Sequence, residues 1–183
     1  MKKIIIIAAA VLSVNIAAKA QNASSTAQQT VQLALSNALD ITFTGSGTTT
    51  GSTLSLPFTS VADYATGVES SAQQLKVRSN KNFNITVSTG AANFSVTNGG
   101  NTTTSTMPVV GVLDLMVSSN QTGGTINSSY SNYGGGLSTS AATLISGGTN
   151  GSNQTFSVKY KATPGFAYAA GTYAVDVVYT ATQ

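Results

Sequence analysis

Apolar and polar residues alternate along most of this chain, with the two-residue period of β-strands that bury one face. The alternation is clearest in four segments: 75–78, 83–87, 156–161 and 173–180. The turn-forming residues 79–82 separate the first two of these segments. We therefore predict that the first two segments form a β-hairpin.

Shorter segments repeat the pattern, at 30–36, 39–43, 53–58 and 94–96, and the Asn/Gly-rich residues 98–101 break it. Pro57 places the third of these at a sheet edge or a strand end, because proline lacks a backbone N–H. Each of the four is predicted to be a short strand.

Three further segments are less regular. Residues 109–117 are almost continuously apolar, which predicts a strand buried on both faces. Residues 61–69 fit either a helical turn or a loop. Residues 118–153 show the weakest pattern, with 141–145 as a candidate short strand. Together, about eight to ten strands with Gly- and Asn-rich connections predict an all-β protein. We expect a single antiparallel β-sandwich of Ig-like or pilin-like, Greek-key type, spanning residues 21–183.

The N-terminus has the three parts of a secretory signal peptide. Lys2 and Lys3 precede an apolar run over residues 4–12, and small residues at 18 and 20 form a cleavage site before Gln21. The run is shorter than the roughly 20 residues that a membrane span requires. The alternative to a cleaved signal peptide is an N-terminal helix that stays in place as a membrane anchor. We expect residues 1–20 to be removed and the protein to reach the periplasm, outer surface or extracellular space.

Removal of the signal peptide changes the charge of the chain. The precursor has a net charge of +3, but residues 21–183 contain five basic and five acidic residues. A neutral chain offers no electrostatic reason to expect binding to nucleic acid or anionic membranes. Because the sequence contains no cysteine, neither a disulfide nor a lipid-modified cysteine is expected.

The residues of most active sites are missing from the composition. The chain has no histidine and no cysteine, which removes the usual nucleophile–base pairs and zinc ligands. Its five acidic residues are widely spread, and we interpret them as solvated strand and turn residues. The sequence therefore predicts a protein that is not an enzyme, without catalytic, cofactor-binding or metal-binding residues.

Two segments resemble known surface proteins of bacteria. They are Leu-Lys-Val-Arg-Ser-Asn-Lys-Asn-Phe-Asn-Ile-Thr-Val at 75–87, and residues 160–165 with the Gly-Thr-Tyr strand at 170–179. They resemble WxL-like surface domains, which are implicated in cell-wall binding, and spore-coat-U and related pilin-like subunits, which polymerise by donating a strand. The style is also similar to that of small exported Bacteroidetes proteins. The Trp of the WxL motif and the disulfide of spore-coat-U subunits are absent here.

Aromatic residues in Gly- and Ser-rich loops are candidate contacts for a glycan, namely Tyr130, Tyr133, Phe166 and Tyr168. Loops on a rigid sandwich commonly carry binding residues, and tyrosine combines an apolar face with a polar tip. The alternative is that these rings only cover the ends of the core.

A candidate donor strand lies near the mature N-terminus. Val31, Leu33 and Leu35 alternate with polar or small residues after the polar stretch 21–29. In donor-strand assembly, such alternating side chains fill successive pockets of a neighbouring subunit. The alternative is that residues 30–36 form the first strand of their own sandwich.

Two functions are compatible with these features. The first is a non-enzymatic surface protein with a structural or adhesive role, such as a fibre subunit that pairs with itself or with other surface subunits. The second is a module of the cell envelope that binds peptidoglycan or another glycan.

Overall fold

The computed structural model describes residues 24–183, so the expected signal peptide lies outside the described residues. The compact domain comprises Ser36–Gln183, and the residues before it belong to a separate unit. The domain is an all-β sandwich of antiparallel sheets, as the alternation predicts.

The strands, in chain order, are β1 (Leu39–Phe43), β2 (Val68–Glu69), β3 (Gln73–Ser79), β4 (Phe83–Thr89), β5 (Asn93–Asn98), β6 (Asn101–Pro108), β7 (Leu113–Asn120), β8 (Thr125–Ile126), β9 (Gly135–Gly136), β10 (Ala142–Gly148), β11 (Gly151–Ala162), β12 (Thr172–Ala174) and β13 (Val177–Thr182). A short helix, α1, spans Val61–Thr66, and a 3-10 turn, η1, spans Ser128–Tyr130.

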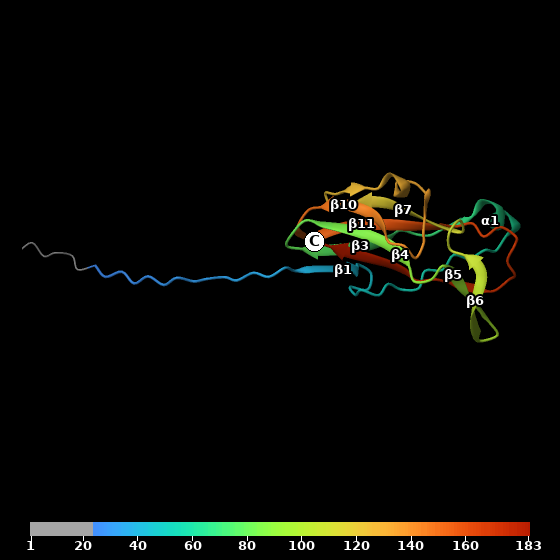
Figure 1. Cartoon of the computed structure of the whole chain (residues 1–183), viewed down its shortest axis with the longest axis horizontal. Helices are drawn as coiled ribbons and strands as arrows, with labels where there is room; N and C mark the ends of the chain where they lie inside the picture. The colour runs from blue at the N-terminus through green and yellow to red at the C-terminus, as the bar shows by residue number, and fades with distance from the viewer. Residues whose placement is uncertain (1–23) are drawn as a thin grey trace, which may run out of the picture. The chain divides into compact units, whose positions relative to one another are not determined.

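The strands form three sheets (Figure 1). The first has the order β1-β3-β11-β7-β9, with β2 also paired to β11, and the second has the order β13-β4-β10-β8. These two sheets enclose the core. The third, β12-β5-β6, lies at the α1 end of the domain, and its β5–β6 hairpin projects from the body.

The predicted hairpin between segments 75–78 and 83–87 is wrong, because β3 and β4 lie in different sheets. Residues 80–82 form an arch that carries the chain from one sheet to the other. Leu75 and Val77 of β3 therefore belong to the same core as Phe83 and Ile85 of β4, and all four are almost fully buried. Alternation alone cannot distinguish the two arrangements, since both bury the same residues.

Two other expectations about strands are wrong for local reasons. Residues 53–58 form no strand, although Leu56 and Phe58 still pack against the core from an extended segment. The run 109–117 contains a turn before β7, where Gly111 has a φ of +78°. Beyond that turn, Leu113, Leu115 and Val117 are buried but the residues between them are only half-buried, so β7 has one buried face.

The single strand expected at 173–180 is two strands. β12 pairs with β5, whereas β13 pairs with β4 in the second sheet, so the chain changes sheets at residues 175–176.

Of the two structures that the sequence allows for residues 61–69, the helical turn is confirmed, as α1. Ser60 caps this helix by accepting a hydrogen bond from the Asp63 N–H, and the Asp63 carboxylate accepts one from the Ser60 N–H at 2.8 Å.

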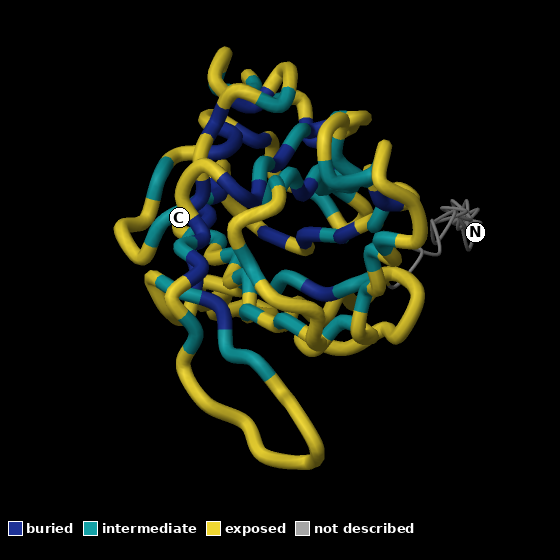
Figure 2. The backbone as a smooth tube through the Cα atoms, turned by 90° about the vertical axis from the view of Figure 1, so that its right-hand side faces the viewer, coloured by how far each residue is buried: buried dark blue, intermediate teal, exposed yellow. Residues whose placement is uncertain are grey.

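The distribution of buried residues in the domain matches the arrangement of its sheets (Figure 2). Most buried residues lie on the strands of the two large sheets, while the tip of the β5–β6 hairpin, residues 97–104, is exposed. The base of the hairpin contributes Phe94 and Met107 to the core. The sequence pattern did not predict β6, because its Thr- and Asn-rich residues show no apolar alternation.

Close packing against Phe83 makes one glycine necessary. A Cβ atom at Gly148 would lie 2.6 Å from the Phe83 ring, whereas a Cβ at Gly136 would meet no atom within 4 Å. We expect Gly148→Ala to lower the free energy of unfolding by about 1–3 kcal/mol through overpacking. Gly136→Ala should change it much less. Urea denaturation of both variants measures the difference, and equal stabilities would contradict the packing described.

Candidate functional sites

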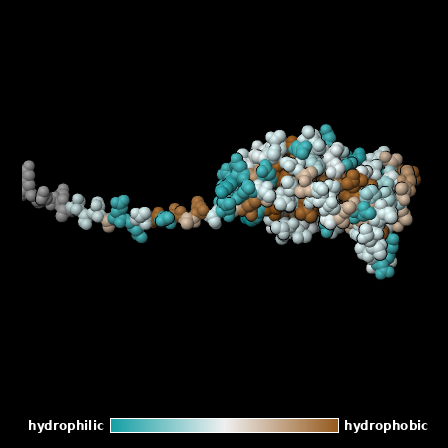
Figure 3. Space-filling model, in the orientation of Figure 1, coloured by the Kyte–Doolittle hydropathy of each residue, from teal (hydrophilic) through white to brown (hydrophobic). Residues whose placement is uncertain are grey.

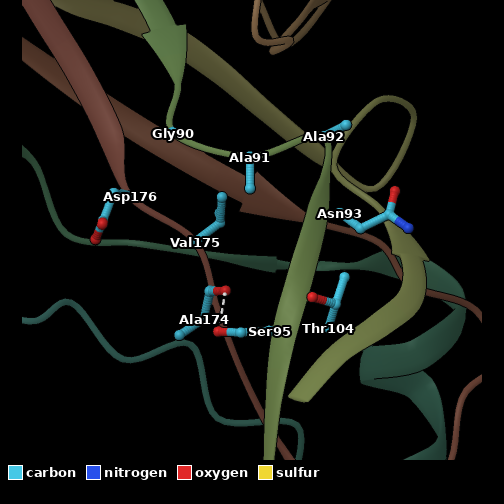
Figure 4. A pocket seen from close by; sticks show the side chains of 9 residues that line it. All are labelled: Gly90, Ala91, Ala92, Asn93, Ser95, Thr104, Ala174, Val175 and Asp176. Carbon is cyan, nitrogen blue, oxygen red and sulfur yellow. Dashed lines mark hydrogen bonds between the residues drawn. The ribbon is translucent and has the colours of Figure 1, made fainter. Parts of the chain in front are cut away.

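A pocket of about 500 Å³ lies where the chain passes from β12 to β13 (Figure 4). The connection 90–92 forms one wall, and β5 and β6 contribute Ser95 and Thr104. Ala91 and Val175 point toward one another across the pocket. Asp176 is the only ionisable residue in the lining, so the pocket contains no acid–base pair.

The polar groups of this pocket are already partly occupied. The Ser95 hydroxyl donates to the Ala174 carbonyl at 3.0 Å. The Asn93 amide donates to the Ser105 carbonyl, also at 3.0 Å. A ligand would therefore meet mainly Thr104 and Asp176, which makes this pocket a weak candidate by itself.

A stack of aromatic rings lies beside α1. The Tyr64 ring stacks on Phe166 with centroids 5.5 Å apart, and it meets Phe58 at a tilt of 53° with centroids 5.3 Å apart. Phe166 is 68% exposed, while Phe58 and Tyr64 are half-buried. One side of Phe166 is thus supported by protein, and much of its remaining surface faces solvent.

The other predicted glycan contacts are less accessible. Tyr130 is 3% exposed and belongs to the core, where its ring closely approaches Gly135. Tyr168 is half-buried and packs against the core. For these two rings, the structure agrees with the alternative that they cover the ends of the core.

Tyr133 lies in a cluster of charged residues on β2, β7 and β11. The Lys161 ammonium lies 5.9 Å from the centre of the Tyr133 ring. Lys161 is directly opposite Glu69 on one neighbouring strand and Asp114 on the other. Burial, followed by the Glu69 carboxylate, raises the pKa of Tyr133 to about 12. Burial also raises the pKa of Asp114, and Lys161 partly offsets that effect. Tyr133 is thus half-buried beside this charged cluster, and its hydroxyl has no hydrogen-bond partner among the described residues.

The candidate donor residues lie outside the domain's secondary structure. No strand or helix is present in residues 24–38, and Val31, Leu33 and Leu35 are 76%, 80% and 87% exposed. Residues 30–36 therefore form none of the strands of the described sheets.

Asn80 fixes the point where the domain begins. Its side chain donates to the Ser36 carbonyl at 2.8 Å and accepts from the Ala38 N–H at 3.0 Å. The Gln183 side chain donates to the Ala38 carbonyl at 2.8 Å. These bonds tie residues 36–38 to the connection between β3 and β4 and to the C-terminal residue of the domain.

The described part of the chain contains neither a metal-binding group of residues nor a membrane-spanning helix. Within residues 24–183, no group of three or more acidic, His or Cys residues is arranged to hold a metal ion. None of the described helices is long and apolar enough to cross a membrane.

Comparison with known proteins gives no family assignment. No family model matches this sequence, and no curated protein is significantly similar to it.

A hydrogen-bonded pair of half-buried tyrosines on β11 and β13 should make the domain sensitive to alkali. The hydroxyls of Tyr160 and Tyr179 are hydrogen-bonded at 2.7 Å. Burial raises the pKa of Tyr160 to about 12 and raises that of Tyr179 well above its usual value. Because both folded-state pKa values are raised, their contribution to stability is present below pH 10 and is lost as the pH rises from 10 toward 12.

We expect the free energy of unfolding to fall over this range by on the order of 2 kcal/mol because of the pair. The Tyr160→Phe, Tyr179→Phe double variant should show a flatter pH dependence in urea denaturation. Tyr168→Phe is the control, since the Tyr168 hydroxyl makes no hydrogen bond within the described residues. A double variant as alkali-sensitive as the control would exclude this explanation.

Proposed function

We propose that this protein is a non-enzymatic structural or adhesive protein of the bacterial cell surface, which assembles through its N-terminal segment. The observation that carries this proposal is the exposure of Val31, Leu33 and Leu35 in an unpaired segment. Large apolar side chains at period two on an unpaired segment expose surface that another chain can bury. The signal peptide expected at residues 1–20 supports a location outside the cytoplasm.

The side of the sandwich formed by β1 and β13 is incompletely shielded from solvent, which supports the same proposal. The core-facing residues of the edge strands are only half-buried, on β1 (Leu39, Ile41, Phe43) and on β13 (Val177, Tyr179, Ala181). The residues opposite them on β3 and β4 are buried. Additional apolar side chains from a neighbouring copy would reduce this exposure. The proposal is therefore that residues 30–36 of one copy pack along the β1–β13 side of the next.

Three charged substitutions test the segment. The triple variant Val31→Asp, Leu33→Asp, Leu35→Asp should lose polymers or higher oligomers of the mature chain, because burial of a carboxylate is costly. Light scattering after size exclusion, together with negative-stain microscopy, measures the assembly state. Circular dichroism checks that the domain remains folded.

The matched control places the same three charges at the alternate positions of the segment, as Thr30→Asp, Gln32→Asp and Ala34→Asp. Because alternate residues of a strand face opposite sides, these changes should preserve more of the assembly. If both variants assemble as the unchanged protein does, or if it forms no assemblies, strand donation by this segment is wrong.

Glycan binding at Phe166 is the second proposed function. The observation favouring it is the exposed Phe166 ring, which Tyr64 supports from one side. Flat aromatic surfaces of this kind pack well against the apolar face of a sugar ring. This role is compatible with adhesion, because a surface subunit can also bind the cell-wall polymer.

Phe166→Ala should weaken retention on peptidoglycan sacculi several-fold, since an aromatic contact contributes on the order of 1 kcal/mol. Val61→Ala is the control, because Val61 is also exposed and apolar but has no ring. Co-sedimentation with purified sacculi measures both variants. Equal retention of Phe166→Ala and the unchanged protein would remove Phe166 from the binding surface.

A further inference from the structure

The outer edge of β6 is an open sheet edge. Of the described strands, only β5 pairs with β6, and residues 101–104 are exposed. The edges of β1 and β13 lie close to one another, since Gln183 bonds to Ala38 and the Phe43 and Tyr179 rings are in contact. The edge strands β8 and β9 contain only two residues each. β6 is therefore the longest edge available for pairing with another strand.

Sheet edges in natural proteins are usually protected by charges, prolines, bulges or covering loops. β6 carries no charged residue, and its only proline, Pro108, is its last residue. Threonine, which favours strands, occupies four of its eight positions. The projecting hairpin is coloured as polar or neutral in Figure 3, without a hydrophobic patch. The register of β6 with β5 shifts between Thr104 and Pro108, whereas residues 101–104 pair regularly. Residues 101–104 are therefore an unprotected edge that offers backbone groups rather than apolar contact.

The hairpin geometry determines which backbone groups are free. Gly99 and Gly100, both with positive φ, form a two-residue turn between Asn98 and Asn101. The residues that flank such a turn form a hydrogen-bonded pair, and bonded pairs alternate with non-bonded ones. Thr103 therefore bonds to β5. The N–H and C=O groups of Thr102 and Thr104 point away from β5.

We propose that two copies of this chain associate by antiparallel pairing of their β6 edges about a two-fold axis at Thr103. Thr102 then pairs with the partner's Thr104, and Thr104 with the partner's Thr102. The arrangement is self-complementary, as a two-fold interface must be. It joins two three-stranded sheets into one continuous sheet.

The side chains near the edge suit a second copy of the same chain. Residues 82–113 contain no charged residue, so two identical hairpins meet without like-charge repulsion. Thr97 and Thr102 already form a hydroxyl hydrogen bond of 2.8 Å across β5 and β6. The pairing extends the same contact, because it places Thr102 opposite the partner's Thr104. The edge is short, so the association is weak and reversible.

The absence of cysteine from the chain allows a clean crosslinking test. Thr103→Cys in the mature chain should form a disulfide-linked dimer under mild oxidation, because the proposed pairing places the two residues 103 directly opposite one another. Thr97→Cys is the matched control: it is exposed on the adjacent strand β5, away from the proposed axis. Non-reducing electrophoresis should show several-fold more dimer for Thr103→Cys. Equal yields would overturn the proposal.

A second variant tests the edge without a thiol. Thr104→Pro removes an N–H that points away from β5, so the domain should fold while the edge loses its donor. Sedimentation equilibrium should show weaker self-association than in the unchanged protein, and unchanged association would overturn the proposal. Both measurements are made in the mature chain and in a variant lacking residues 21–36. A crosslink that persists in the shortened chain separates β6 pairing from assembly through the N-terminal segment.

Discussion

The arch between β3 and β4 is the constraint on which the rest of the domain depends. It places the apolar faces of two successive strands opposite one another in different sheets, so that Leu75 and Val77 belong to the same core as Phe83 and Ile85. Without a disulfide in the chain, burial between these sheets must supply most of the stability. Gly148 shows how closely the core is packed around the first residue after the arch.

The same arrangement determines which surfaces remain for interaction. The large sheets bury their central strands but leave the core-facing residues of β1 and β13 half-exposed, and the third sheet leaves β6 without a second neighbour. Only one salt bridge, between Arg78 and Asp40, is present among the described residues.

The candidate glycan contacts show why loop residues are difficult to interpret from sequence. Tyr130 and Phe166 both lie in Gly-rich surroundings, yet Tyr130 is in the core and Phe166 is exposed. The difference arises from the 3-10 turn, which directs Tyr130 inward against Gly135, and from α1, which supports Phe166 through Tyr64. Neither contact is visible in the local sequence, because each joins segments whose positions depend on the sheets. The pocket beside Asp176 was missed for the same reason.

The sequence by itself determined the β class and the buried face of most strands, because alternation records which side chains avoid water. The two-residue period of the apolar side chains in residues 30–36 also indicated this segment as a candidate donor strand. Only the tertiary structure decided that 75–78 and 83–87 face one another, that 173–180 divides between two sheets, and that residues 30–36 and 53–58 form no strand of the described sheets. The physical reason is that strand pairing is made by backbone groups common to all residues. The side-chain pattern therefore specifies the face that is buried, but not the neighbour to which each strand is bonded.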